Sequence, residues 1–333
     1  MTLSVESKEI WTSELLKRPC PLCGSRDNVI ISRRMKDNIN LPTVICRECS
    51  LVFTNPLPKE EIYNRFYEEA YNDFYIHQEK FTPSNKIPGD VRQIIDIISK
   101  FLPDNNSRIL EIGSGSGRLI YYLSDKYPNI KGIEPGSNSA NAKATYRLNI
   151  IDDFFESHDF GDEKFNLILM VHVFEHFYDV NQALLKCRDL LTGNGYLFIE
   201  VPNILKPFKS PDHYFLRYVH PINYSPYTIK SLLLKHGFLT VYEDSEGNRG
   251  LGPKNIRVVA VKDNSEKLSS QTEKISYKDV IKEFKLKRLE WILYGRTYFN
   301  LVKSFRLIKS KLVRSVIGDI IKKIVRHKRD IYF

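Results

Sequence analysis

Short apolar strands, a glycine turn and helix-like stretches follow one another through the middle of the chain. The clearest run is RILEIGSGSGRLIYYL at 108–123, where an apolar strand at 109–112 enters alternating glycines and then a helical stretch. A second strand, IKGIEPG at 130–136, ends in Glu134. The apolar period of QALLKCRDLL at 182–191 predicts a helix with Cys187 as a small core residue. These elements predict a strand–turn–helix unit in which the glycine turn faces a ligand.

Two further apolar runs, VIISRR at 29–34 and PTVICR at 42–47, can pair as a hairpin near the N-terminus. Paired cysteines flank that hairpin: Cys20, Cys23, Cys46 and Cys49. The two-residue spacing within each pair lets both sulfurs reach one ion. Four thiolates fill the tetrahedral shell of Zn²⁺, so we expect a closed structural zinc site rather than a catalytic one. Such a site can supply the folding free energy of a small module, on the order of 10–16 kcal/mol.

The charge of the 333-residue chain is concentrated at its C-terminal end. The formal net charge is +10, and residues 284–333 carry fourteen Lys and Arg against Glu290, Asp319 and Asp330. Between 301 and 317 apolar residues recur every three or four positions with basic residues between them, which predicts an amphipathic basic helix. It could lie on an anionic membrane, contact nucleic-acid phosphates, or pack on its own enzyme or a second subunit.

No apolar run is long enough for a spanning helix, and the N-terminus MTLSVESKEIW lacks the pattern of a secretory signal. The expected location is the cytoplasm, with the tail allowing peripheral contact on the inner face of the membrane. Five cysteines in a reducing compartment also argue against a disulfide framework.

The order ILEIGSGSG, GIEPG, FNLILMVHVFEHF and LLTGNGYLFIEVPN resembles class I S-adenosylmethionine-dependent methyltransferases over about 105–205. A dinucleotide fingerprint would require a glycine at position 118, which is Arg118. The resemblance implies a Rossmann-like, seven-stranded α/β sheet, closed by an antiparallel pair from FLTVYED and NIRVVAVK. It also implies that the cofactor is held by Glu111 (methionine amino group), Gly113, Ser114, Gly115, Gly117, Glu134 (ribose) and Asp153 (adenine amine). Asp152 is a close rival of Asp153.

The N-terminal segment CPLCG…CRECSLVFTNPLPKEEIYNRFYEEAY is similar to methyltransferases of bacterial surface-polysaccharide and deoxysugar pathways. By that similarity Tyr67 or Tyr71 closes over the cofactor, although each could equally be a buried aromatic residue. Downstream, EVPN and YVHPINYSPYTIKSLLLKHGF match the same family, which places Asn203 and His220 at the carboxyl ends of strands, where α/β sheets bind ligands.

The chemistry is expected at MVHVFEH, residues 170–176. His176 and His220 are the candidate general bases, since an imidazole can accept a hydroxyl proton near neutral pH, and Glu175 could orient an imidazole or bind the acceptor. The Pro-containing segment of base-amine methylases is missing, which favours an oxygen or carbon acceptor. Related enzymes carry E-x-x-E-H here, and in RNA methyltransferases it binds a divalent ion. With His172 in place of the first acid, a metal held by His172, Glu175, His176 and His220 stays open, as does a purely structural role.

The sequence therefore predicts four parts. They are a zinc module at 1–58, connecting helices that cap the cofactor site at 59–104, a methyltransferase domain at 105–264 and a helical basic tail at 265–333. The expected function is methylation of a sugar oxygen or carbon in polysaccharide, O-antigen or glycolipid biosynthesis, with structural Zn²⁺. The expected partners are a sugar-containing small molecule or lipid-linked glycan, and nucleic acid is less favoured. An RNA 2′-O-methyltransferase, with or without a catalytic metal, is the alternative.

Overall fold

The computed structural model divides the chain into two compact units, residues 1–284 and 285–333. The structure describes residues 12, 14–33, 35, 39–69, 82–84, 86–136, 143–144, 146–206, 211, 215–245, 254–263 and 274–291, with the backbone alone for 66–69. The expected amphipathic helix at 301–317 lies outside these residues, and so does Tyr71.

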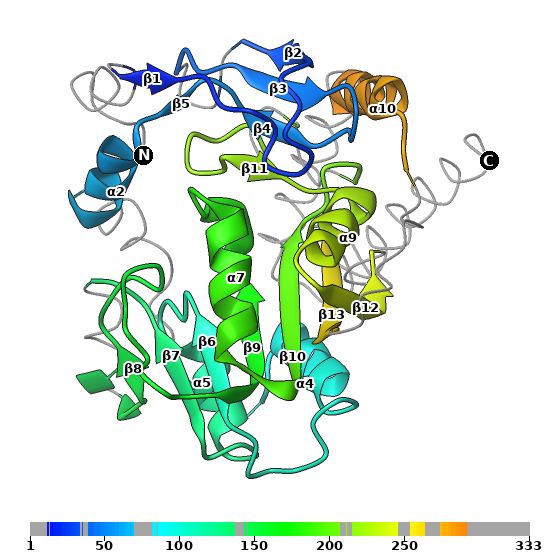
Figure 1. Cartoon of the computed structure of the whole chain (residues 1–333). Coiled ribbons are helices and arrows are strands. Elements are labelled where there is room, and N and C mark those ends of the chain that lie inside the picture. Colours follow the sequence, from blue (N-terminus) through cyan, green and yellow to red (C-terminus); the bar gives the residue numbers. More distant parts are fainter. Residues whose placement is uncertain are drawn as a thin grey trace, which may run out of the picture. The chain divides into compact units, whose positions relative to one another are not determined.

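The first unit is built on a mostly parallel central sheet (Figure 1). In the described residues it has seven strands in the order β12-β13-β10-β9-β6-β7-β8. Their bounds are β6 (Ile109–Ile112), β7 (Ile130–Ile133), β8 (Ile150–Ile151), β9 (Phe165–Val171), β10 (Leu191–Pro202), β12 (Phe238–Asp244) and β13 (Asn255–Lys262). Strands β6 to β10 pair in parallel, whereas β13 runs antiparallel to both β10 and β12. The prediction of an α/β sheet closed by an antiparallel pair is confirmed.

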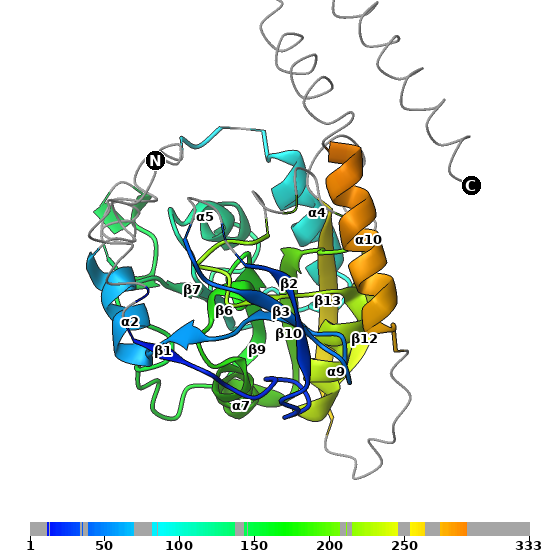
Figure 2. The ribbon, with the colours of Figure 1, turned by 90° about the horizontal axis from the view of Figure 1, so that it is seen from above.

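Helices cover both faces of this sheet, and Figure 2 shows α4 and α5 on one face and α7 and α9 on the other. Their bounds are α4 (Gly89–Ile98), α5 (Arg118–Ser124), α7 (Val180–Leu190) and α9 (Pro226–Lys235). Helix α7 begins where the Asp179 side chain accepts two backbone N–H groups, and α9 begins with a Ser225–Thr228 capping box. Separate apolar clusters fill the two interfaces. Cys187 is fully buried in α7, which confirms its prediction as a core residue.

The N-terminal region forms a second sheet, and its edge strand β11 (Ile222–Asn223) comes from later in the chain. In the described residues its order is β11-β4-β3-β2, with bounds β2 (Asn28–Ser32), β3 (Thr43–Cys46) and β4 (Val52–Thr54). Strands β2 and β3 pair antiparallel with Val29 opposite Ile45, so the predicted hairpin is confirmed. A short pair, β1 (Leu15–Leu16) with β5 (Leu57–Pro58), lies beside it.

Two more helices flank this N-terminal sheet, α2 (Glu60–Glu69) and α10 (Tyr277–Glu290). Val280 and Phe284 of α10 are buried in one cluster with Ile45 and Val52 of the N-terminal sheet. The start of the segment that the sequence assigns to the tail is therefore part of the first folded unit.

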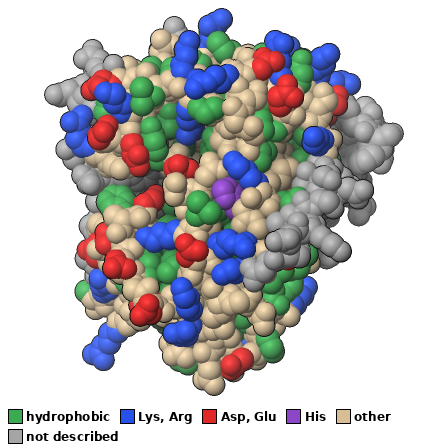
Figure 3. Space-filling model, in the orientation of Figure 1, with side chains coloured by type: hydrophobic (Ala, Val, Ile, Leu, Met, Phe, Trp, Pro, Cys, Tyr) green, Lys and Arg blue, Asp and Glu red, His purple; other side chains and the backbone are tan. Residues whose placement is uncertain are grey.

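The surface in Figure 3 carries Lys and Arg side chains interspersed with Asp and Glu. This mixture fits a chain whose excess positive charge belongs to residues 284–333. Among the described residues no helix combines the length and the apolar character needed to cross a membrane.

Candidate active site

The glycine turn between β6 and α5 has the backbone geometry that only glycine adopts easily. Gly113, Gly115 and Gly117 all have positive φ, at 69°, 51° and 71°. A Cβ on Gly113 would lie 2.3 Å from the Val173 side chain, so this glycine also lets the segment that follows β9 pack closely against the turn. A Cβ on Gly115 would meet nothing within 4 Å, which leaves the turn open on that side. The turn is thus shaped to bring bare backbone against a ligand.

Two buried carboxylates stand beside this turn. Glu111 on β6 is 4% exposed and Glu134, directly after β7, is 5% exposed. Burial, and then the charge of Glu134, raise the pKa of Glu111 well above its usual range. The Glu111 Oε2 atom has no hydrogen-bond partner among the described residues. A buried acceptor without a donor is costly, so this pair is prepared for a ligand that brings positive charge and hydroxyl donors.

Three other predicted cofactor residues differ in what the structure shows of them. The Ser114 side chain is buried and packs against Gly132: a Cβ added to Gly132 would lie 2.6 Å from the Ser114 hydroxyl. The hydroxyl therefore points toward the sheet rather than to the open side of the turn. The Asp153 carboxylate contacts a residue close in sequence, with its Oδ2 atom 2.9 Å from His158 Nδ1. Asp152 Oδ1 instead accepts a hydrogen bond from the backbone N–H of Gly136, which follows β7. Tyr67 lies in α2, and its side chain is outside the described residues.

The histidine side of the site begins where β9 ends. A single 3₁₀ turn, η2 (Phe174–His176), presents Glu175 and His176, and the loop before β11 brings His220 against them. The His176 and His220 rings meet edge to face with centroids 4.7 Å apart. Glu175 is 3% exposed, its Oε1 lies 3.9 Å from His176 Nε2, and its Oε2 has no partner among the described residues. The structure therefore brings together the three residues that the sequence selects for chemistry.

Burial makes both imidazoles weaker bases than the free side chain. It lowers the pKa of His176 to about 4 against the opposing charge of Glu175, and burial together with the charge of His176 lowers the pKa of His220 well below its usual range. Both rings are therefore neutral at neutral pH and can accept a proton. The sequence-based expectation that they titrate near neutrality does not hold in this environment. His220 Nδ1 is buried and has no partner among the described residues, which leaves one hydrogen bond for a ligand to complete.

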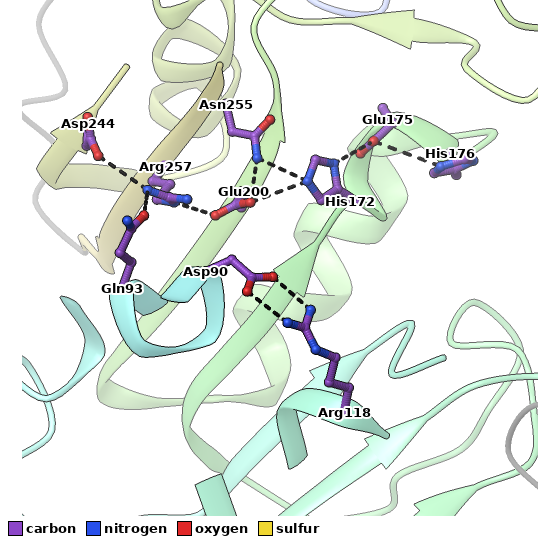
Figure 4. A network of polar contacts seen from close by, with 10 residues as sticks. All are labelled: Asp90, Gln93, Arg118, His172, Glu175, His176, Glu200, Asp244, Asn255 and Arg257. Atoms are coloured by element: carbon purple, nitrogen blue, oxygen red, sulfur yellow. Dashed lines mark hydrogen bonds and ion pairs between the residues drawn. The ribbon is translucent and has the colours of Figure 1, made fainter. Parts of the chain in front are cut away.

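His172 connects this group, through Glu175, with the polar contacts around Glu200, as Figure 4 shows. Its Nδ1 lies 3.6 Å from Glu175 Oε1 and its Nε2 lies 3.3 Å from Glu200 Oε1. Burial disfavours the charged ring, but these two carboxylates outweigh it and raise the pKa of His172 to about 10. Its side chain is 40% exposed, so the desolvation is incomplete. His172 also has a positive φ of 57°, which is uncommon for a residue other than glycine.

Sequence reasoning did not identify Glu200 and Asn255 as partners of His172. Glu200 of β10 stands opposite Arg257 of β13 in the sheet and forms a buried ion pair with it. Arg257 Nη1 also binds Gln93 of α4 at 3.0 Å, and Asn255 Nδ2 donates to Glu200 Oε1 at 2.6 Å (Figure 4). The sequence did hold a signal for this ion pair: Glu200 is a carboxylate within the apolar strand YLFIEVP, and a buried charge needs a partner of opposite charge.

Metal-binding geometry occurs at two places in the described residues. The ligand atoms of Cys20, Cys23, Cys46 and Cys49 all lie within 4.8 Å of one another, and so do those of Glu175, His176 and His220. The sulfurs of two cysteine pairs are 3.4 and 3.5 Å apart, well beyond a disulfide bond. The second group does not include His172. The sequence had left open a metal held by four residues, His172 among them, and the structure brings together only the other three.

Asn203, which the sequence places on the substrate side, follows β10 and bridges to Tyr224. It is 1% exposed, and its Oδ1 accepts the backbone N–H of Leu205 while its Nδ2 has no partner among the described residues. One end of this amide thus shapes the loop, and the other is available to a ligand.

Comparison with protein families agrees with this geometry. Residues 86–243 match a family model described as a methyltransferase domain. That segment holds the glycine turn, both cofactor-side carboxylates and the Glu175, His176 and His220 group. The match covers just under half of the chain, and the matched segment has the Rossmann-like fold described above.

Curated relatives match at low identity. The C-methyltransferase NovU of Streptomyces niveus is 21% identical over 60% of this chain and 47% of its own length. A ubiquinone biosynthesis O-methyltransferase of Bradyrhizobium diazoefficiens is 30% identical over 29% of this chain and 40% of its own length. The chain thus spans less than half the length of these relatives. Among solved structures, the 1,6-didemethyltoxoflavin-N1-methyltransferase of Burkholderia thailandensis aligns with a TM-score of 0.49 at 15% identity, covering 64% of this chain and 96% of that one.

Proposed function

We propose that this protein is an S-adenosylmethionine-dependent methyltransferase that methylates an oxygen or carbon of a sugar. The observation that carries the proposal is the position of two unlike sets of groups at the carboxyl ends of neighbouring parallel strands. One set consists of Glu111 near the end of β6, the glycine turn that follows it and Glu134 directly after β7. The other consists of the neutral His176 after β9, joined by His220 from the loop before β11. Ligands of open α/β sheets bind at this edge.

The cofactor-side residues fit the cofactor chemically. Glu111, whose Oε2 is an orphaned buried acceptor, suits the methionine ammonium, and Glu134 suits the ribose hydroxyls. Gly113, Gly115 and Gly117 let the turn pass close to the ligand, and Ser114 contributes backbone because its hydroxyl is buried elsewhere. Tyr67 and Asp153 complete the proposed set. The bound cofactor supplies an activated methyl group on a sulfonium.

The histidine side supplies what the acceptor needs. A hydroxyl must lose a proton as it is methylated, and His176 or His220, both neutral, can take it. The Glu175 carboxylate near His176 Nε2 stabilises the imidazolium that forms. For a carbon acceptor the same base removes the proton of the carbon. Relatives named as a C-methyltransferase and an O-methyltransferase support these two acceptor atoms over nitrogen.

The polysaccharide, O-antigen or glycolipid setting rests on the N-terminal resemblance. In this proposal the acceptor is a nucleotide sugar or a lipid-linked glycan. The basic tail then provides peripheral contact with the inner face of the membrane for a cytoplasmic enzyme, where each basic residue adds about 1 kcal/mol.

The four cysteines are proposed to hold a structural Zn²⁺. Their sulfurs form a compact group of four that a tetrahedral ion fits, and no thiol within it is paired as a disulfide. The metal count of the purified protein tests this directly. One zinc per chain supports the cysteine site alone, whereas a second metal ion would place one at Glu175, His176 and His220.

The acceptor is tested with the purified full chain and methyl-labelled cofactor, offered separately nucleotide sugars, lipid-linked glycans and total RNA. Label in a sugar fraction is the expected result. Label that enters RNA alone contradicts the sugar acceptor and supports the RNA 2′-O-methyltransferase. Failure to bind S-adenosylhomocysteine in calorimetry contradicts the enzyme class itself.

A further inference from the structure

The two catalytic histidines sit on segments that share no regular secondary structure with each other. His176 ends the 3₁₀ turn η2, and His220 lies in the loop before β11. Their rings are nonetheless held edge to face. An active site needs reacting groups fixed to a fraction of an ångström, so something must hold these two backbones in register.

Tyr63 of helix α2 reaches both segments. It is 3% exposed, and its hydroxyl donates to the His176 carbonyl at 2.6 Å and lies 3.5 Å from the Val219 carbonyl. One of these carbonyls belongs to the first histidine and the other to the residue before the second. A single phenol oxygen therefore stands between the two segments.

Arg18 makes a second bridge between the same two segments, at residues that follow each histidine. Its Nη1 donates to the Tyr178 carbonyl at 3.1 Å and its Nη2 donates to the Pro221 carbonyl at 3.3 Å. The Arg18 backbone is fixed in turn, because its N–H donates to Asn55 Oδ1 at 3.0 Å and its carbonyl accepts from Asn55 Nδ2 at 3.1 Å. The planar guanidinium suits this role, since its donors diverge in a fixed fork.

The N-terminal cysteine module, residues 1–58, also holds the segment that contains His220. Strand β4 of the module pairs with β11, which begins two residues after His220. The Thr54 N–H also donates to the Pro221 carbonyl at 2.9 Å, so this carbonyl is held by two donors from the module. Arg18 itself stands two residues before Cys20 in the chain.

We propose that Arg18 and Tyr63 are positioning residues that clamp the His176 and His220 segments together, so that the N-terminal module and helix α2 set the geometry of the catalytic histidines. The clamp takes four carbonyls: those of His176 itself and of Tyr178 in the first segment, and those of Val219 and Pro221 on either side of His220 in the second. Neither donor lies on the glycine turn or beside Glu111 and Glu134. The clamp therefore acts on turnover and leaves cofactor binding intact. This inference rests on the proposed function for its kinetic part.

The test compares Tyr63→Phe and Arg18→Gln with two matched controls. Tyr127→Phe removes another buried hydroxyl that donates to a carbonyl, that of Leu102 at 2.9 Å. Arg188→Gln removes another guanidinium that donates to backbone carbonyls, those of His236, Gly237 and Asp263. Both controls lose the same kind of bond, at carbonyls outside the His176 and His220 segments.

We expect kcat to fall about tenfold for Tyr63→Phe and about hundredfold for Arg18→Gln, because a small misplacement of reacting groups is that costly. The Kd for S-adenosylhomocysteine should stay within about twofold, as expected for groups that touch no ligand. Arg18→Lys should recover part of the loss, since one ammonium can serve one of the two carbonyls. The controls should lower the melting temperature by a similar amount and leave kcat within about twofold.

A second measurement does not need activity. The ring proton and carbon signals of His176 and His220, assigned by NMR in the full chain, should shift in Tyr63→Phe and Arg18→Gln and stay in place in both controls. Unmoved signals with unchanged kcat would overturn the clamp, as would equal kcat losses in the controls. If the wild type transfers methyl to no acceptor, the proposed function fails, and the ring signals still decide the clamp.

Discussion

The cofactor side and the histidine side of the site are built in opposite ways. On the cofactor side, Glu111, the glycines and Glu134 come from one continuous stretch of strand, turn, helix and strand. On the histidine side, η2, the loop before β11, helix α2 and the cysteine module all contribute. The first is a local structure, and the second exists only once distant segments have packed.

Their electrostatics differ as well. On the cofactor side, burial and then the charge of Glu134 raise the pKa of Glu111, which suits a cationic ligand. The histidine side keeps its imidazoles neutral by burial and places one carboxylate beside them. Damage to the folding of distant parts should therefore disable catalysis before it disables cofactor binding.

Loss of the cysteine site should separate the two sides most strongly. In Cys20→Ser the fourth thiolate is missing, and the expected result is loss of one zinc per chain with unfolding of the module, since structural zinc contributes on the order of 10–16 kcal/mol to such modules. Turnover should vanish while S-adenosylhomocysteine still binds in calorimetry. Cys187→Ser, a thiol buried in α7, is the matched control and should keep its zinc. Simultaneous loss of binding and turnover in Cys20→Ser would show that the two sides are not independent.

Removal of a histidine should have the next largest effect. In His176→Ala or His220→Ala we expect kcat to fall by about 10²- to 10⁴-fold, the range for loss of a general base, with the Kd for S-adenosylhomocysteine unchanged. His236→Ala removes a partly buried ring bonded to Asn181 instead, and it should leave kcat near the wild-type value. A parallel loss of cofactor affinity would assign the histidines to binding.

Glu134→Ala should give the reverse pattern. A carboxylate that accepts from both ribose hydroxyls makes charged hydrogen bonds worth about 1.5–3 kcal/mol, so the Kd should rise roughly tenfold to a hundredfold. At saturating cofactor kcat should change little. Glu163→Ala, which removes an exposed carboxylate paired with Lys131, should change neither quantity. Calorimetry and initial rates on the same preparations make the comparison, and a fall in kcat alone would contradict the assignment.

This difference explains what the sequence could predict. The glycine turn, its flanking carboxylates and the paired cysteines are set by spacing within short windows, so the fold and the four-cysteine cluster were predictable. The sheet order and the hairpin between β2 and β3 agree with that reading. The seven-stranded sheet with its closing antiparallel pair was implied by the resemblance to methyltransferases that these motifs carry.

The contacts around the histidines were not predictable in the same way. Nothing in the sequence near Arg18 or Tyr63 indicates that each reaches carbonyls on two distant segments. The weak basicity of His176 arises from burial, which depends on tertiary packing. His172 was considered with the metal ligands because of its spacing, yet its ring lies between Glu175 and Glu200.

The smallest expected effect concerns stability on the cofactor side. Because the folded state raises the pKa of Glu111 above its ordinary value of 4.5, ionisation of this group opposes folding. Its contribution to stability is fully present below about pH 4.5 and is lost as the pH rises toward the higher folded pKa. The amide in Glu111→Gln does not ionise, so at pH 7 we expect this variant, without ligand, to gain stability. The expected gain is about 1–3 kcal/mol, the cost of a buried unsatisfied group.

Denaturant unfolding between pH 4 and 8 measures this gain in the free energy of unfolding, and S-adenosylhomocysteine should stabilise the variant less than the wild type. Equal pH slopes in the two proteins would show that Glu111 is not the strained carboxylate of this site.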